Sequence, residues 1–207
     1  MSGHLKALGC REHETLVEIT FGGYLMFKKL EKESYRDYFY SILKEVEYTY
    51  YNTEETDSLC EFIKGYNSER DFKKICFLWN GSNGSEFTDY NYGFREKISI
   101  YICMHEKINV PSKLLKDIIQ EYGKASSASW GAPEYLFLLC EKLLIESGLM
   151  YIRTFGETLF TNMDTYGSCL GIDFTNINVQ QILYELEKIN PRDKLISDLT
   201  EYFKSHM

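Results

Sequence analysis

The sequence predicts an all-α protein, a single compact array of roughly eight to ten helices. Three observations support this fold class. Apolar residues recur with the helical period of about 3.6 residues through most of the chain. Proline and glycine stand where helices are expected to begin and end. Segments that alternate like a β-strand are too few for a sheet, which needs several strands. We therefore expect residues 1–207 to form a single helical domain.

The first half of the chain contains three expected helical segments. "TFGGYLMF", from Thr20, places Gly22 and Gly23 inside an apolar segment that we expect to be helical, where each glycine costs about 1 kcal/mol relative to alanine. Such glycines indicate a close helix contact or a break. Two further segments each carry one apolar stripe. In the segment from Ser34, the stripe consists of Tyr35, Phe39, Ile42, Leu43, Val46 and Tyr50. In the segment "SERDFKKICFLW", it consists of Phe72, Ile75, Cys76 and Trp79.

Two segments in the chain fit more than one structure. In "KISIYICM", three isoleucines alternate with other residues as in a strand, yet Phe94, Ile98, Tyr101 and His105 also share a helical face. We favour a helix here, and the alternative is an α+β fold whose small sheet includes residues 98–104. "GSCLGIDF", residues 167–174, is equally ambiguous, and we expect a loop.

The second half has clear helix boundaries. Pro111 and Pro133 precede "SKLLKDIIQEYG" and "EYLFLLCEKLLIESG", and Gly123 and Gly148 are the expected stops. The second of these helices is apolar almost all round, so we expect it to be central. Two amphipathic helices follow, residues 179–189 and 195–203, and Asn190-Pro191 should begin the last one, with Asn190 as its N-cap.

The composition narrows the function classes. A formal charge of −8 argues against an extended nucleic-acid groove, which needs clustered lysine and arginine. No apolar run approaches the ~18 residues of a membrane span, and the N-terminus lacks the apolar core of a secretion signal. Six widely spaced cysteines without a C-x-x-C pair indicate buried thiols in a reducing compartment. We expect a cytoplasmic protein.

Catalytic, metal and cofactor sites have little support in the sequence, and we assign none. Cys103 and His105 are the only close cysteine and histidine, and side chains two residues apart point in different directions on either a strand or a helix. Zinc sites use recurrent short Cys and His spacings, and none occurs here. The glycines of residues 79–94 resemble a phosphate-binding loop, but no Gly-Lys-Ser/Thr follows.

The stretch "EVEYTYYNTEETDSLCE", residues 45–61, is the strongest functional signal. It has no lysine or arginine, and Tyr48 should point away from the apolar stripe of its helix, with Tyr51 to the side. Exposed tyrosine among acids is typical of protein interfaces. A solvated helix face followed by an acidic loop is the alternative. The expected partner-binding residues of this stretch are Glu45, Glu47, Tyr48, Tyr51, Glu54, Glu55, Asp57 and Glu61.

Residues 79–94, "WNGSNGSEFTDYNYGF", contain a second group of acids and tyrosines with no basic residue before Arg95. Its members are Glu86, Asp89, Tyr90 and Tyr92. A turn between helices and an interaction surface are both compatible with this composition.

A small, acidic, compact chain with two such patches resembles the immunity proteins that neutralise bacterial toxins, as in contact-dependent growth inhibition systems. The resemblance implies a non-enzymatic protein whose carboxylates cover the basic cleft of a cognate toxin domain, expected to be a nuclease. Its partner would be a protein, neither nucleic acid nor membrane. The alternatives are an enzyme with a dispersed active site around Cys103, His105 and the 79–94 loop, and a helical adaptor or scaffold.

Overall fold

The computed structural model describes residues 5–11, 14–21, 24–30, 36–37, 39–44, 53–105, 107–129, 131–189 and 193–207. The chain divides into two compact units, Met1–Thr49 and Tyr50–Met207. The helices of the expected array lie mainly in the second unit.

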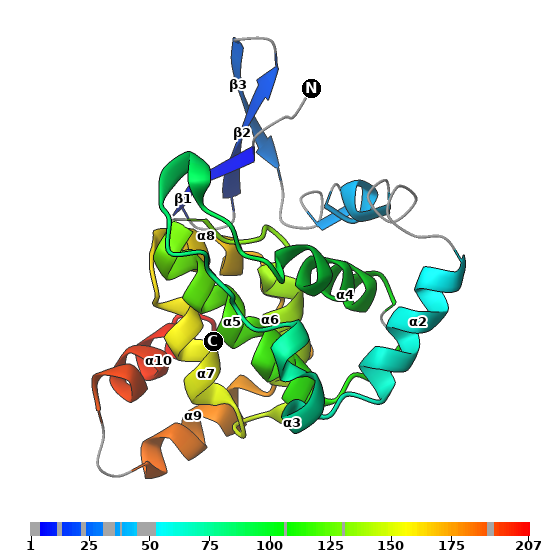
Figure 1. Cartoon of the computed structure of the whole chain (residues 1–207). Helices are drawn as coiled ribbons and strands as arrows, with labels where there is room; N and C mark the ends of the chain where they lie inside the picture. The colour runs from blue at the N-terminus through cyan, green and yellow to red at the C-terminus, as the bar shows by residue number, and fades with distance from the viewer. Residues whose placement is uncertain are drawn as a thin grey trace. The chain divides into compact units, whose positions relative to one another are not determined.

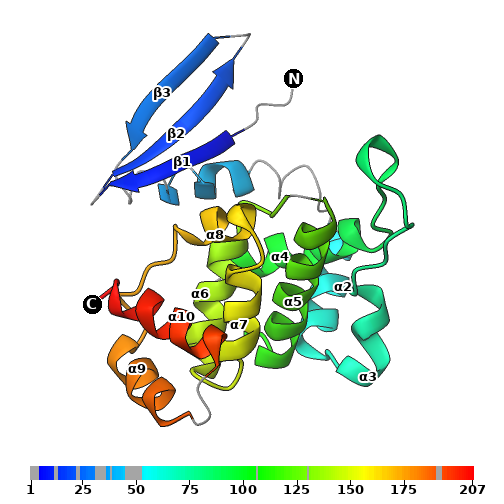
Figure 2. The same cartoon turned by 90° about the vertical axis from the view of Figure 1, so that its left-hand side faces the viewer.

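The first unit contains an antiparallel sheet of three strands in the order β1-β2-β3 (Figure 2). The strands are β1 (Leu5–Arg11), β2 (Glu14–Phe21) and β3 (Tyr24–Leu30). Phe21 pairs with Tyr24, so β2 and β3 are joined through Gly22 and Gly23 alone. Two-residue hairpin connections favour glycine. The prediction of a helix around this glycine pair is therefore wrong.

The predicted helix from Ser34 is confirmed for the residues that the structure describes. Residues 36–37 and 39–44 are helical, and Phe39 and Leu43, two members of its predicted apolar stripe, are each 2% exposed. Residues 45–52, which hold the other half of this prediction, lie outside the described residues.

The second unit is a helical array, and the all-α prediction is confirmed there (Figure 1). Within its described residues, the one β pairing is an isolated bridge between Trp79 and Asp89. Short 3-10 turns occupy Phe72–Lys74 and Gly84–Glu86. The α-helices are α2 (Thr53–Lys64), α3 (Ser68–Asp71), α4 (Tyr92–Met104), α5 (Ser112–Ser129), α6 (Leu136–Ser147), α7 (Ile152–Leu159), α8 (Met163–Cys169), α9 (Val179–Lys188) and α10 (Lys194–Lys204).

The two segments with ambiguous patterns are both helical at least in part. Residues 98–104 belong to α4, so the helix prediction is confirmed and a sheet at that position is excluded. For residues 167–174 the loop prediction holds only in part, because α8 continues to Cys169. The helix that was expected to reach Trp79 is also shorter, since α3 and the following 3-10 turn end at Lys74.

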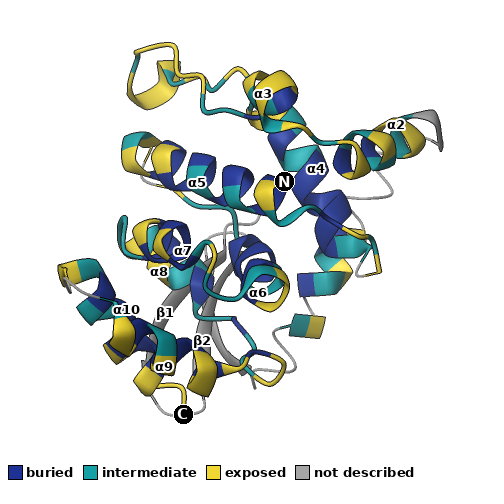
Figure 3. Cartoon of the chain, turned by 90° about the horizontal axis from the view of Figure 1, so that it is seen from below, coloured by how far each residue is buried: buried dark blue, intermediate teal, exposed yellow. Residues whose placement is uncertain are grey.

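In the core of the second unit, α5 packs against α6 and α7, and α7 packs against α10 (Figure 3). Helix α6 also packs against α4 and α8, so it is central as predicted. Ring contacts between Phe155 of α7 and Phe203 of α10, with centroids 5.9 Å apart, close one side of the core. Each fully buried Leu, Ile or Phe side chain contributes about 1.5 to 3 kcal/mol relative to exposure. The most deeply buried side chains from α5 and α6 include Leu114, Leu115, Ile118, Ile119, Leu136, Phe137, Leu139 and Leu143.

Gly123 does not end α5, contrary to the prediction, because its lack of a side chain serves a packing contact. A Cβ added there would lie 3.0 Å from Thr158 Oγ1 of α7, so the glycine lets the two helices approach. Gly148 does end α6, with a φ of 52° in the left-handed region.

The last helix begins differently from the prediction. Asp193 is the N-cap of α10, and its Oδ1 accepts a hydrogen bond from the Ile196 backbone N–H at 2.9 Å. The predicted cap, Asn190, and Pro191 lie outside the described residues.

Candidate functional site

Helix α2 carries the described part of the first acidic patch. Leu59 and Ile63 face the core, at 5% and 0% exposure, which turns the opposite face of α2 to solvent. Asp57 and Glu61 lie one turn apart and are both exposed, and neither has an ion-pair partner within the described part of the chain. The two like charges repel at this spacing, by a few tenths of a kcal/mol, about 0.2 to 0.5. This face therefore favours a cationic neighbour.

Glu55 differs from these two acids because it has a basic partner. Its Oε1 lies 3.2 Å from Lys97 Nζ of α4, and both side chains are partly exposed.

Aromatic contacts also hold α2 in place. The ring of Phe62 meets that of Phe94 edge to face, with centroids 5.1 Å apart, and Lys74 Nζ lies 5.4 Å from the centroid of the Phe62 ring. These contacts fix α2 against the start of α4.

The remaining predicted members of the first patch are not placed by the structure. Glu45, Glu47, Tyr48 and Tyr51 lie outside the described residues, and Glu54 belongs to α2 without a described side chain. Their presentation to a partner stays a prediction.

The second predicted patch separates into exposed and buried members. Glu86 is exposed, and Tyr90 is 68% exposed. Tyr92 is 42% exposed, and its hydroxyl donates to Glu96 Oε1 at 2.8 Å. Partial burial and the neighbouring Glu96 carboxylate raise the pKa of the Tyr92 phenol, which stays protonated.

Asp89 does not lie on the predicted surface, because its carboxylate is buried as an internal anchor. Its side chain is 2% exposed and forms an ion pair with Arg95, whose side chain is fully buried. Asp89 Oδ1 also accepts from the backbone N–H groups of Leu78 and Asn91, at 3.1 and 3.2 Å. A buried charge needs such pairing. The sequence pattern could not distinguish this acid from its exposed neighbours.

The two patches do not merge into one surface. Figures 1 and 3 both show the loop before α4 and helix α2 far apart across the helical unit. A single compact binding site on this unit would use one patch or the other.

Cys103 and His105 have separate structural roles. Burial raises the pKa of the Cys103 thiol, which makes a poor nucleophile. The His105 ring stacks on Tyr101, with centroids 4.0 Å apart, and its Nδ1 lies 3.0 Å from the Tyr101 carbonyl oxygen. This geometry does not support the two as a nucleophile and its base.

Two buried acids on α5 were not predicted from the sequence. Asp117, 2% exposed, accepts hydrogen bonds from Tyr66 at 2.8 Å and Ser68 at 3.0 Å, and its other oxygen lies 2.9 Å from Lys113 Nζ. Burial acts to raise the pKa of Asp117, but these partners outweigh it and the pKa is lowered. Asp117 therefore ties the α3 region to α5.

Glu121, one turn further along α5, has a similar role. Its Oε2 accepts from the Phe77 backbone N–H at 2.7 Å, and its Oε1 lies 2.6 Å from Lys124 Nζ. The spacing of Asp117 and Glu121 on one helical face is the sequence signal that could have identified them, since acids on an otherwise buried face need internal partners.

No group of three or more His, Cys, Asp and Glu side chains in the described ranges could hold a metal ion. None of the helices described is both long and apolar enough to cross a bilayer.

Comparison with known proteins adds no relative. No protein-family profile matches the chain, and neither characterised proteins nor solved structures give a match. Its class is therefore defined by its own structure: a helical array with an N-terminal antiparallel sheet, and with acidic and aromatic side chains exposed on the array.

Proposed function

We propose that this protein binds and neutralises a basic bacterial toxin domain of the nuclease class, in the manner of an immunity protein. The observation that carries the proposal is the exposed pair Asp57 and Glu61 on α2. In the sequence, this pair follows three further acids, Glu45, Glu47 and Glu54. A nuclease cleft is lined by lysine and arginine to hold phosphates. Carboxylates on one face of α2 would occupy the positions that the phosphates take in such a cleft.

The physical benefit of such a surface lies chiefly in association rate and specificity. Like charges gathered on one face raise the energy of the free protein slightly, and a cationic partner reverses that cost. Complementary charge speeds diffusional encounter and excludes acidic partners. Tyr48 and Tyr51, which the sequence predicts to be exposed among these acids, would supply apolar contact area.

The test begins with the unchanged full-length protein as bait in an extract of the native organism. The expected result is capture of a basic protein with nuclease activity, and inhibition of that activity by the purified bait. A gene for such a protein directly beside the gene for this chain would support the same conclusion. Capture of no basic protein would contradict the proposal.

A matched pair of variants then locates the interface. Asp57→Lys with Glu61→Lys should raise the dissociation constant about tenfold or more, equivalent to about 1.4 kcal/mol, and make it less dependent on salt. Glu187→Lys with Glu201→Lys changes the net charge equally at exposed positions of α9 and α10. Equal weakening of toxin binding by both pairs of substitutions would indicate a general charge effect and would exclude α2 as the binding surface.

A further inference from the structure

The segment of residues 77–92, here the aromatic loop, is fixed by internal hydrogen bonds. Asn80 organises it: its Oδ1 accepts from the N–H groups of Ser82 and Thr88, both at 3.1 Å, and its Nδ2 donates to the Glu86 carbonyl at 2.7 Å. Buried Asp89 and Glu121 hold its two ends, as described above. The loop therefore presents a defined surface.

This loop holds large apolar side chains in solvent. Leu78 is 49% exposed and Trp79 is 40% exposed, beside the exposed Tyr90. The Tyr90 N–H donates to the Leu78 carbonyl at 3.1 Å, so these residues lie side by side. The rings of Phe77, Trp79 and Phe87 lie within 6.2 to 6.5 Å of one another, centroid to centroid. Rigid exposure of aromatic surface is unfavourable unless a partner covers it.

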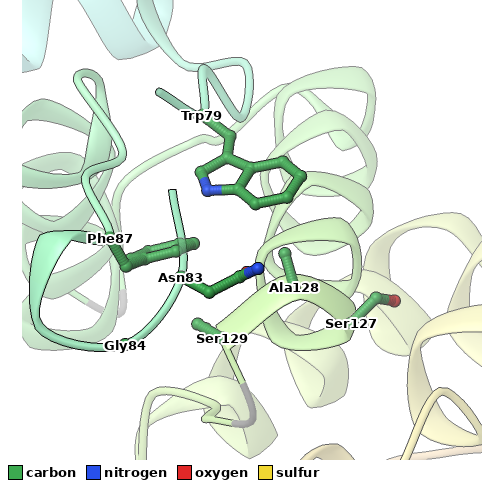
Figure 4. A pocket seen from close by; sticks show the side chains of 7 residues that line it. All are labelled: Trp79, Asn83, Gly84, Phe87, Ser127, Ala128 and Ser129. Atoms are coloured by element: carbon green, nitrogen blue, oxygen red, sulfur yellow. The ribbon is translucent and has the colours of Figure 1, made fainter. Parts of the chain in front are cut away.

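A pocket of about 800 Å³ opens between the aromatic loop and the last turn of α5 (Figure 4). This volume is typical of ligand-binding clefts. Among the described residues, no charged side chain lines it. Its lining residues are Trp79, Asn83, Gly84, Phe87, Ser127, Ala128 and Ser129.

The hydrogen-bonding groups of this pocket limit what it can receive. The Trp79 indole N–H already donates to the Ser82 carbonyl at 2.7 Å. Ser127 and Ser129 donate to helix carbonyls at 3.2 and 2.8 Å, so their oxygens remain as acceptors only. Asn83 makes no side-chain hydrogen bond to the described residues. The pocket thus offers aromatic walls, two acceptors and one free amide.

We propose that this pocket receives a tyrosine or tryptophan side chain from a protein partner. Such a ring fills apolar space and carries one N–H or O–H for the Asn83 carbonyl oxygen or a serine oxygen, whereas a sugar would leave most of its hydroxyl groups without partners here. The exposed Leu78 and Tyr90 extend beyond the area that one ring would cover, which favours a macromolecule over a free aromatic compound. A second pocket of about 510 Å³ shares Phe87 and Ser129 with the first and extends the surface available to the partner.

This proposal goes beyond the proposed function. It concerns a part of the helical unit distant from α2, and its test requires no toxin. Failure to capture a toxin and failure of the pocket to bind a ring would therefore be separate results.

The experiment titrates the full-length protein with p-cresol and indole, the side-chain analogues of tyrosine and tryptophan. Amide and indole N–H chemical shifts are followed by NMR. We expect saturable shifts at the Trp79 indole and at the backbone of Asn83, Gly84 and Ala128, with dissociation constants on the order of 1 mM. Toluene, which lacks the hydroxyl donor of p-cresol, should bind about tenfold more weakly.

Variants make the test specific. Ala128→Phe places a ring in the pocket and should abolish p-cresol binding, while Gln180→Phe adds the same ring at an exposed position of α9 and should not. Asn83→Ala, at an exposed loop position, should weaken indole binding several-fold even if Ala128→Phe fails to fold. Shifts that do not saturate, p-cresol binding no tighter than toluene, or tighter binding of methyl glucoside than of p-cresol would overturn the proposal.

Discussion

Arg95 anchors the aromatic loop from the interior through its ion pair with Asp89. Its side chain is fully buried, and its guanidinium donates to the Ile75 carbonyl at 3.0 Å and lies 4.9 Å from the centroid of the Tyr122 ring. The side chain of arginine does not lose its charge in proteins. Asp89 is therefore required as its counter-ion.

Removal of that counter-ion should be costly. In Asp89→Ala the Arg95 charge stays buried without its carboxylate, so the free energy of unfolding should fall by about 3 to 5 kcal/mol. Urea denaturation measures the change. Glu86→Ala, at an exposed position of the same loop, should stay within about 0.5 kcal/mol of the unchanged protein. Equal effects of the two variants would refute the assignment of Asp89 as an internal anchor.

Asp117 makes stability depend on pH in acid solution. Because the folded-state pKa is lowered, its stabilising contribution is complete above the unfolded-state pKa of about 3.9 and is lost as the pH falls through the folded-state value. Asp117→Asn should therefore cost about 1.5 to 3 kcal/mol at pH 7, and the difference should shrink below about pH 4.

Denaturation at pH 7, 5 and 3 measures this dependence. Asp57→Asn, at an exposed position of α2, serves as the control and should change stability by no more than about 0.5 kcal/mol at each pH. A difference between the Asp117 variant and the unchanged protein that persists undiminished at pH 3 would show that the charge is not responsible.

At the scale of the elements, glycines inside helices set how closely the helices pack. A Cβ on Gly156 of α7 would lie 2.8 Å from Leu199 Cδ1 of α10, whereas one on Gly167 of α8 meets nothing within 4 Å. Both glycines are helical. Alanine at either position changes the helix propensity, but only alanine at Gly156 also changes the packing between helices.

Gly156→Ala should lower the free energy of unfolding by about 1 to 3 kcal/mol, because the added methyl group overpacks the contact between α7 and α10. Gly167→Ala should raise it by up to about 1 kcal/mol, since alanine is the better helix former. Thermal and urea unfolding of the two variants measure both effects. A stabilising Gly156→Ala would mean that the Leu199 side chain moves aside freely.

The sequence predicted those elements whose pattern is local. The apolar patterns of α6, α9 and α10 and the stop at Gly148 follow from the chain itself. Gly123 was misread as a stop, because the contact with Thr158 that requires it comes from a helix distant in the sequence. The N-terminal hairpin was misread for a related reason: short apolar runs fit either period, and strand pairing decides between them.

For the whole molecule, the sequence indicated where acids and tyrosines concentrate but not which of them are exposed. Asp57, Glu61, Glu86 and Tyr90 lie at the surface as the composition suggested. Asp89 does not, since only the fold brings Arg95 to it. Burial depends on partners from other elements, so a prediction from composition can locate a patch without identifying which of its residues are exposed.

The placement of the thiols in the second unit provides a reporter of how its core opens. Cys140 and Cys169 are 0% and 1% exposed, with their sulfurs 3.9 Å apart, whereas Cys60 and Cys76 are partly exposed. A thiol-reactive label should modify Cys60 and Cys76 much faster than Cys140 and Cys169, which react only during transient opening, at a rate that falls as stability increases. Peptide mapping over a time course would thus measure the opening equilibrium of α6 and α8 without denaturant.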